Sequence, residues 1–157
     1  MYKITFLTII KKENSAVNAV YYPVSIKDLN KTDKRESGYC RVKVEGKDLS
    51  FYGKKIKTKN KNFWVYAANP GKIKKPSNSH PIVQSYVDLF IGGCFQIKER
   101  YKINEFPKQC VETTTEWSKH WVNDRVHARR PFLVPNFYKI DNLLSNFFDY
   151  YLDNKYQ

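Results

Sequence analysis

Residues 117–130 hold the side chains whose types and spacing could do chemistry. Two of the chain's three histidines lie there, together with three arginines. If the segment is helical, His120, Asp124 and His127 recur at i, i+4 and i+7 and share one face. Imidazoles can serve as general base and general acid near neutral pH, and Arg125 could stabilise the charge that develops on a phosphorane. His120, His127 and Arg125 are therefore the candidate catalytic residues of a small, metal-independent endoribonuclease of the toxin type.

The same segment supports two plainer interpretations. Arginine binds phosphate well because its planar guanidinium donates two parallel hydrogen bonds, so Arg129 and Arg130 are predicted to contact nucleic acid. In the other interpretation the segment packs, with the histidine between the two tryptophans held in a helix and Arg125 paired with Asp124 or Glu116. The sequence leaves binding, catalysis and packing open for this segment.

A basic block between residues 41 and 75 is the second candidate site. It contains eleven Lys or Arg against two acids, a net charge of +9 within 35 residues. In residues 54–61 lysine alternates with other residues, so in an extended segment the alternate lysines share one face. Such a row suits the phosphates of a nucleic-acid strand, whose neutralisation releases counterions. The predicted contacts of the block are Arg41, Lys43, Lys54, Lys55, Lys57, Lys59, Lys61, Trp64 and Tyr66.

Aromatic residues flank the basic block, namely Tyr52, Phe63, Trp64 and Tyr66. Stacking of a base on an exposed ring contributes about 1–3 kcal/mol, so rings interleaved with lysines favour a single strand over a duplex. In the alternative interpretation the rings belong to the core and the lysines form a solvated loop. Strand alternation limits the choice, because Phe63 and Val65 cannot face the same side as Trp64 and Tyr66.

No pattern in the sequence indicates a metal or a cofactor. The cysteines and histidines lack the paired short spacing of a structural zinc site, and there is no glycine-rich phosphate loop. Asp88 followed by Gln96 and Lys98 loosely matches the acid-and-lysine pattern of metal-dependent nucleases, but so short a match is common by chance. We therefore predict no metal ligand and no cofactor.

The composition indicates the class of partner. The 157 residues fit a single domain over 1–157, and 28 basic residues against 15 acidic ones give a net charge of +13. A surplus of this size indicates a polyanionic partner; a Lys-rich surface kept for solubility is the alternative. The apolar runs are far shorter than the roughly 20 residues of a membrane span, and three cysteines without framework spacing indicate a reducing compartment. We expect a cytoplasmic protein that does not bind membranes.

The first half of the chain, which would position the basic block, is predicted to be β-structure. Residues 39–45 alternate cleanly, with apolar side chains on one face and Arg41 and Lys43 on the other. A tight turn would join this strand to residues 49–52 in a hairpin. The predicted strands are residues 2–10, 18–26, 39–45, 49–52 and 63–68, with a loop over 27–38.

The second half is predicted to mix helices with a strand. Gly92-Gly93 would stop the first helix, and the spacing of Thr113 and Glu116 is that of a capping box. The apolar residues of the last helix recur at i, i+3, i+4 and i+7, so it is amphipathic. Helices are predicted over residues 81–90, 113–122 and 140–152, and a strand over 94–103. The expected class is α+β: a curved, mainly antiparallel sheet or small β-barrel with two or three packed helices, including the C-terminal amphipathic one.

The favoured functional prediction is a nucleic-acid-binding protein, for RNA or single-stranded DNA. It would grip phosphates through the Lys-rich segment 41–75 and the Arg-rich segment 125–130. The first alternative is the endoribonuclease built on the two histidines. The second is a viral or mobile-element protein that binds an acidic protein partner, because aromatic and Arg-rich surfaces also suit protein interfaces.

Overall fold

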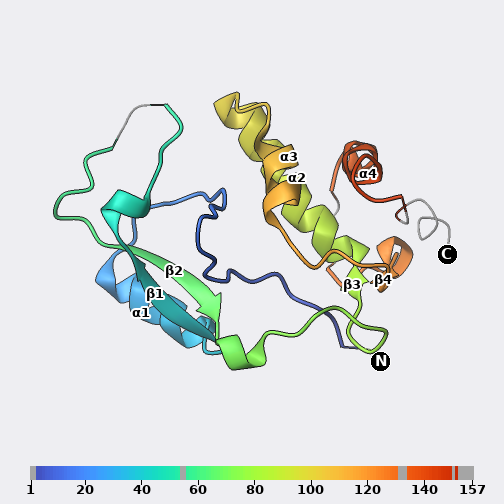
Figure 1. Cartoon of the computed structure of the whole chain (residues 1–157), viewed down its shortest axis with the longest axis horizontal. Helices are drawn as coiled ribbons and strands as arrows, with labels where there is room; N and C mark the ends of the chain where they lie inside the picture. Colours follow the sequence, from blue (N-terminus) through green and yellow to red (C-terminus); the bar gives the residue numbers. More distant parts are fainter. Residues whose placement is uncertain (1–2, 54–55, 131–133, 150, 152–157) are drawn as a thin grey trace. The chain divides into compact units, whose positions relative to one another are not determined.

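The computed structural model describes residues 3–53, 56–130, 134–149 and 151. Helices and short strands follow one another along these residues (Figure 1). The α-helices are α1 (Ile26–Arg35), α2 (Gln84–Tyr101), α3 (Phe106–Thr113) and α4 (Phe137–Ser145), and the strands are β1 (Tyr39–Val44), β2 (Phe63–Ala68), β3 (Ile82–Val83) and β4 (Trp121–Val122). The predicted α+β class is therefore confirmed. None of the described helices is both long enough and apolar enough to cross a lipid bilayer.

The strands form two small sheets within the described residues. β1 pairs with β2 in an antiparallel sheet, and β3 pairs with β4 in a parallel one. Each sheet has two strands, and in this part of the chain they do not close into a barrel. The larger share of the ordered backbone is helical, with four α-helices among the described residues where two or three were expected.

The chain gathers into two compact units. The core unit comprises residues 1–6, 14–20 and 75–157, and the hairpin unit comprises residues 7–13 and 21–74. The expectation of a single domain stays a prediction. Every residue that is buried in the described part of the chain belongs to the core unit.

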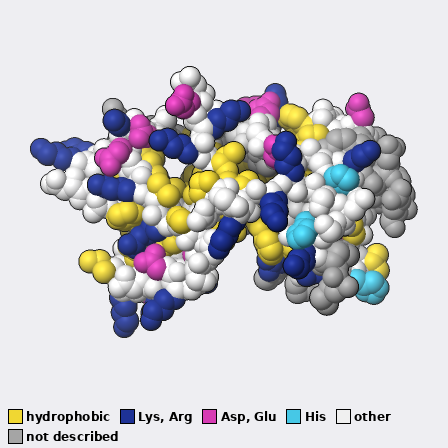
Figure 2. Space-filling view, turned by 60° about the horizontal axis from the view of Figure 1, so that its bottom comes forward, with side chains coloured by type: hydrophobic (Ala, Val, Ile, Leu, Met, Phe, Trp, Pro, Cys, Tyr) yellow, Lys and Arg dark blue, Asp and Glu magenta, His cyan; other side chains and the backbone are white. Residues whose placement is uncertain are grey.

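Most of the surplus charge belongs to the hairpin unit. Its sequence holds 16 basic and six acidic residues, a net +10 of the chain's +13. Figure 2 shows basic side chains, in dark blue, outnumbering acidic ones on the visible face. The described part of the hairpin unit has no buried residue, and the lysines and arginines within that part are exposed.

The hairpin unit is built on the β1–β2 pair, whose six-residue register begins with Tyr39 opposite Ala68. Both strands are rich in β-branched and aromatic residues, which favour extended backbone, and both strand predictions are confirmed. The predicted partner of β1 was wrong: residues 49–52 form no strand, and β1 pairs with β2 across a long loop. The longer partner supplies apolar cross-strand pairs such as Val42 opposite Val65, which stabilise a sheet more than a short turn can.

Helix α1 occupies residues that were predicted as a loop. Ser25 caps it, because its Oγ accepts a hydrogen bond from the N–H of Asp28 at 3.1 Å. Lys34 and Arg35 lie in the last turn, where they complement the negative end of the helix dipole. No residue of α1 is buried, so the helix lacks the apolar stripe from which helices are predicted. The Ser-x-x-Asp spacing was the only sequence signal.

The two strands predicted nearest the N-terminus were wrong. Residues 3–10 and 18–25 form no strand. Isolated hydrogen bonds hold the first of these segments, for example from the N–H of Thr5 to the carbonyl of Pro81 at 3.0 Å. A single bond of this kind fixes a segment beside its neighbour without the repeated pairing that makes a ladder.

Helix α2 runs through the glycine pair that was predicted to stop it. Gly92 is buried, and a Cβ at this position would come within 2.9 Å of the Cγ1 of Val134. Glycine therefore permits a close approach by the segment that carries Val134. The predicted strand over 94–103 was wrong because α2 continues through this stretch to Tyr101, where Lys102 caps it with a left-handed φ of 58°.

Residues 113–122 are not the helix that the capping-box spacing predicted. Thr113 is the last residue of α3, and Glu116 has a left-handed backbone with a φ of 63°. The rings of Trp117 and Trp121 stack, with centroids 5.6 Å apart, and Trp121 enters β4. Packing of these two large rings outweighs the local capping signal, since aromatic side chains bury a large apolar area.

The main apolar cluster of the core unit confirms the C-terminal helix in part. Ile140 and Leu144 of α4 are almost fully buried in the cluster, while α4 ends at Ser145, short of the predicted end at residue 152. Residues 152–157 lie outside the described residues. The buried members of the cluster are Ile82, Val87, Ile91, Val111, Trp121, Ile140, Leu144 and Tyr151.

Candidate functional site

One face of the β1–β2 hairpin gathers predicted contact residues. The register places Arg41 opposite Tyr66 and Lys43 opposite Trp64. Directly opposed residues of an antiparallel pair share a face, so these four side chains form what we call the ring-and-cation face. The guanidinium of Arg41 lies 4.7 Å from the centroid of the Trp64 ring, which is 39% exposed. A cation over an exposed ring is a geometry that suits base stacking next to a phosphate.

Asp33 of α1 fixes two members of this face. Its carboxylate accepts hydrogen bonds from Nη1 of Arg41 at 2.9 Å and from the hydroxyl of Tyr66 at 2.6 Å. Desolvation of the hydroxyl, followed by the hydrogen bond and the charge of Asp33, raises the pKa of Tyr66 above its usual value. Tyr66 and Arg41 are therefore held in place, and Trp64 is the ring best placed to receive a base.

The lysines of the block do not line one strand face. The N–H of Lys61 donates to the carbonyl of Thr58 at 3.1 Å, and Asn60 has a φ of 61°, so the chain turns here. This turn interrupts the row of alternate lysines that an extended segment would form. Lys57, Lys59 and Lys61 are exposed. Lys54 and Lys55 lie outside the described residues.

The two candidate catalytic histidines lie in different local structures. Residues 117–130 form no α-helix, so the single face predicted for His120, Asp124 and His127 does not form. His120 precedes β4, and its Nδ1 lies 2.6 Å from Oδ1 of Asn78. His127 is exposed at the end of a 3-10 turn. The spacing that suggested an acid–base pair therefore carries no geometric support.

Arg125 is held by two buried carboxylates. Its Nε and Nη2 each lie 2.7 Å from an oxygen of Asp88, and its Nη1 and Nη2 lie 3.1 and 2.7 Å from the oxygens of Asp141. Burial by itself lowers the pKa of Arg125, but the hydrogen bonds from the two carboxylates outweigh it, and the pKa is raised. This geometry favours the packing interpretation of Arg125, with partners other than those that the sequence suggested.

Two neutral residues complete this buried polar network. Gln84 donates from Nε2 to Asp88 at 2.8 Å and accepts at Oε1 from the indole N–H of Trp121 at 2.9 Å. The hydroxyl of Tyr151 lies 2.7 Å from Oδ1 of Asp141. Burial, followed by the hydrogen bond to Asp141, raises the pKa of Tyr151. With two carboxylates and one guanidinium, the network carries a net negative charge that keeps the Tyr151 proton in place.

Replacement of Tyr151 by phenylalanine tests this network through its pH dependence. At neutral pH Y151F should be less stable than the wild type by about 1–2 kcal/mol, because a buried hydrogen bond is lost. Above about pH 10 an unfolded tyrosine ionises while folded Tyr151 stays protonated, so the wild type loses more stability than Y151F as the pH rises. The difference in unfolding free energy, measured by urea denaturation, should therefore narrow at alkaline pH.

An exposed tyrosine of the same region supplies the control for this experiment. Tyr138 of α4 is 54% exposed, and Y138F should match the wild-type unfolding curve throughout the pH series. A difference between Y151F and the wild type that stays constant from about pH 7 to about pH 11 would contradict the expected titration.

Asp124 positions the two remaining arginines. Its carboxylate accepts two hydrogen bonds from Ser85, one from the N–H at 2.7 Å and one from the hydroxyl at 2.6 Å. It accepts a third from the N–H of Arg129 at 2.8 Å. The N–H of Arg130 donates to Oγ of Ser85 at 3.1 Å. The backbone of Arg129 and Arg130 is thereby fixed to the first turn of α2, and both residues line a pocket.

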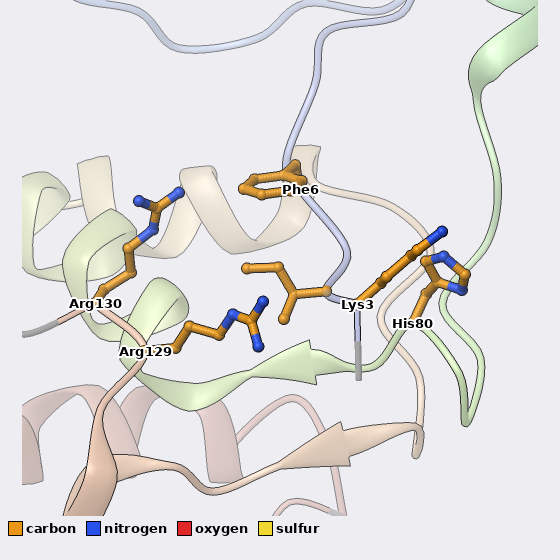
Figure 3. Close-up of a pocket in the computed structure, with 6 residues that line it drawn as sticks. Lys3, Phe6, His80, Arg129 and Arg130 are labelled. Carbon is orange, nitrogen blue, oxygen red and sulfur yellow. The ribbon is translucent and has the colours of Figure 1, made fainter. Parts of the chain in front are cut away.

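This pocket has a volume of about 460 Å³ and is lined in part by residues that sequence analysis missed. Figure 3 shows Arg129 and Arg130 extending from one side and Lys3 and His80 lying together on the other. No local pattern joins positions so far apart in the chain, so no sequence signal could have found them together. The lining residues are Lys3, Ile4, Phe6, His80, Arg129 and Arg130.

The loose nuclease pattern finds no support in the geometry. Asp88 is engaged by Arg125 and Gln84, and Gln96 and Lys98 lie more than two helical turns further along α2. Among the described residues, no group of three or more His, Cys, Asp or Glu side chains could hold a metal ion.

Comparison with protein families, with curated proteins and with solved structures finds no match.

Proposed function

We propose that the protein binds RNA or single-stranded DNA through the ring-and-cation face of the hairpin unit. The observation that carries the proposal is the β1–β2 register, which puts Lys43 beside an exposed Trp64 over which Arg41 lies. A base stacks on such a ring whatever its identity, and the neighbouring cations contact the flanking phosphates. The proposal needs the hairpin alone and not the curved sheet or β-barrel that the sequence suggested.

The charge of the hairpin unit supports the same partner. A net +10 in its 61 residues attracts a polyanion over several ångströms and raises the encounter rate. Lys57, Lys59 and Lys61 are exposed in the loop that precedes β2, within the same unit as the stacking ring. We assign them to phosphate contacts, which give affinity without base specificity.

Neither alternative function has a comparable observation in its favour. The endoribonuclease requires His120, His127 and Arg125 as a set, but the helical face is absent and Arg125 is held by Asp88 and Asp141. An acidic protein partner would also meet a basic surface, but it would not require an exposed ring beneath a guanidinium. This second alternative becomes an outcome of the binding experiment.

Binding of a fluorescently labelled single-stranded oligonucleotide tests the proposal. If four phosphates are neutralised, a slope of about −0.7 per phosphate predicts that affinity falls about 50-fold between about 50 and 200 mM salt. Fluorescence anisotropy at several salt concentrations measures this slope. Replacement of Lys57, Lys59 and Lys61 together by glutamine should flatten the slope by about two units, because three phosphate contacts are lost.

A matched triple variant in the core unit removes the same charge. Its affinity should fall less than that of the loop variant, and its salt slope should stay near that of the wild type. Negligible binding at low salt would overturn the proposal, and capture of an acidic protein by the same surface would then favour the second alternative. The matched substitutions are Lys98→Gln, Lys102→Gln and Lys108→Gln.

A further inference from the structure

Hydrogen bonds hold the segments that line the pocket of the core unit. Thr5 ties the N-terminal segment to the segment before β3, since its N–H donates to the carbonyl of Pro81 at 3.0 Å and its Oγ1 donates to the carbonyl of His80 at 2.6 Å. On the other side, Asp124 and Ser85 hold the backbone of the two arginines. Three segments far apart in sequence are thus fixed around one cavity.

The lining of the pocket is cationic. Lys3, Arg129 and Arg130 contribute full positive charges, His80 contributes an imidazole, and none of the six lining residues is acidic. The first turn of α2 lies close by, but its N–H at Ser85 is already occupied by the carboxylate of Asp124. The attraction for an anion therefore comes from the side chains. Guanidinium groups favour phosphate in particular, because they match its oxygens in pairs.

An aromatic wall adjoins these cations. The guanidinium of Arg130 lies 5.7 Å from the centroid of Phe6 and 5.6 Å from that of Tyr86. The two rings meet edge to face, with centroids 5.8 Å apart. Phe6 is 50% exposed, and Figure 3 shows its ring at the rim of the pocket. A ring at this place offers an apolar surface to a planar group attached to the anion.

We propose that this pocket binds the phosphate monoester of a nucleotide, with the phosphate among Lys3, Arg129 and His80 and the base against Phe6. The volume of about 460 Å³ lies within the range of about 300–1,000 Å³ that small-molecule sites occupy, and it exceeds what a bare phosphate needs. Two sources share this chemistry: a free mononucleotide and the 5′-phosphorylated end of a strand. The site belongs to the core unit and does not depend on the ring-and-cation face.

The test compares ligands that differ only in the phosphate. The full chain is titrated with AMP and with adenosine by calorimetry, and with a labelled octanucleotide that carries either a 5′-phosphate or a 5′-hydroxyl. The phosphate should tighten binding about tenfold in at least one of the two pairs. Preference for AMP over adenosine identifies a free nucleotide as the ligand, and preference confined to the octanucleotide identifies a strand end.

Arg129→Gln combined with Arg130→Gln should abolish this phosphate preference. The fold should persist, because the hydrogen bonds from the main-chain N–H groups of these residues to Asp124 and Ser85 do not require the arginine side chains; an unchanged melting temperature checks this. Arg100→Gln, an exposed arginine of α2, is the matched control and should keep the full preference. Equal binding with and without the phosphate in both pairs, or a preference that survives in the double variant, would overturn the proposal.

The same measurements separate this site from the hairpin face. Trp64→Ala should lower the affinity for both octanucleotides by the same factor and leave the affinity for AMP unchanged. If the 5′-hydroxyl octanucleotide does not bind while AMP does, the pocket stands and the function proposed for the hairpin unit fails.

Discussion

Replacement of Arg125 by methionine is expected to destabilise the protein by about 3–5 kcal/mol, the range for removal of one partner of a buried ion pair. The substitution leaves the carboxylates of Asp88 and Asp141 facing one another in the core, only 6% and 2% exposed, with no positive charge between them. Methionine fills much of the same volume, so the loss reflects charge more than packing. Urea unfolding followed by circular dichroism measures the difference from the wild type.

The pH dependence of R125M identifies the cause. Without the guanidinium the two buried carboxylates repel each other, and acidification that removes their charge removes this repulsion, so the variant should recover stability relative to the wild type at low pH. Adding Asp88→Asn and Asp141→Asn to R125M should recover most of the unfolding free energy that R125M loses at neutral pH. The exposed Arg100→Met is the control and should change stability by less than about 0.5 kcal/mol. A loss in R125M that is the same at every pH would assign the effect to packing instead.

Trp64→Ala is expected to weaken binding of a single-stranded oligonucleotide about tenfold, because one base–ring stack contributes about 1–3 kcal/mol. The slope of affinity against salt should not change, since the ring carries no charge. Trp64→Phe should retain most of the affinity, because a smaller π-face is still present. Anisotropy titrations of the three proteins at a fixed salt concentration give these values.

The chain offers a close match for this control. Tyr101, at the end of α2, is 55% exposed and has the guanidinium of Arg100 5.6 Å from its ring centroid. It is therefore a second exposed ring with a cation over it, in the core unit. Tyr101→Ala should bind the oligonucleotide as the wild type does. An affinity of W64A equal to that of the wild type would show that bases do not stack on this face.

The sequence predicted correctly those elements whose signal is local and repeated. Strands β1 and β2 alternate, and Ile140 and Leu144 lie one helical turn apart on the buried side of α4. Prediction failed where the signal was absent or was overridden. Helix α1 has no apolar stripe, and the glycine pair of α2 serves the close approach of Val134 rather than a helix end. The approach of Val134 cannot be known before the neighbouring segment is in place.

The strand alternation also determined part of the candidate site. Once Arg41 and Lys43 share a face, the cross-strand register brings Trp64 and Tyr66 to the same side. What the sequence could not supply was the partner strand, since a nearer segment had similar residues. The sequence showed a basic block, but not that most of the net charge belongs to one compact unit. That conclusion required the division of the chain into two units, which only the contacts of the folded chain define.

The sequence by itself determined the sign and size of the charge and the alternation of rings with cations, because these depend only on residue order. The tertiary structure decided the surroundings of each arginine of the 125–130 segment. Arg125 is neutralised between two carboxylates that lie 37 and 16 residues away, whereas Arg129 and Arg130 meet Lys3 and His80 around a pocket. Side chains distant in sequence share an environment only after folding, so residue order alone could not predict the surroundings of each arginine.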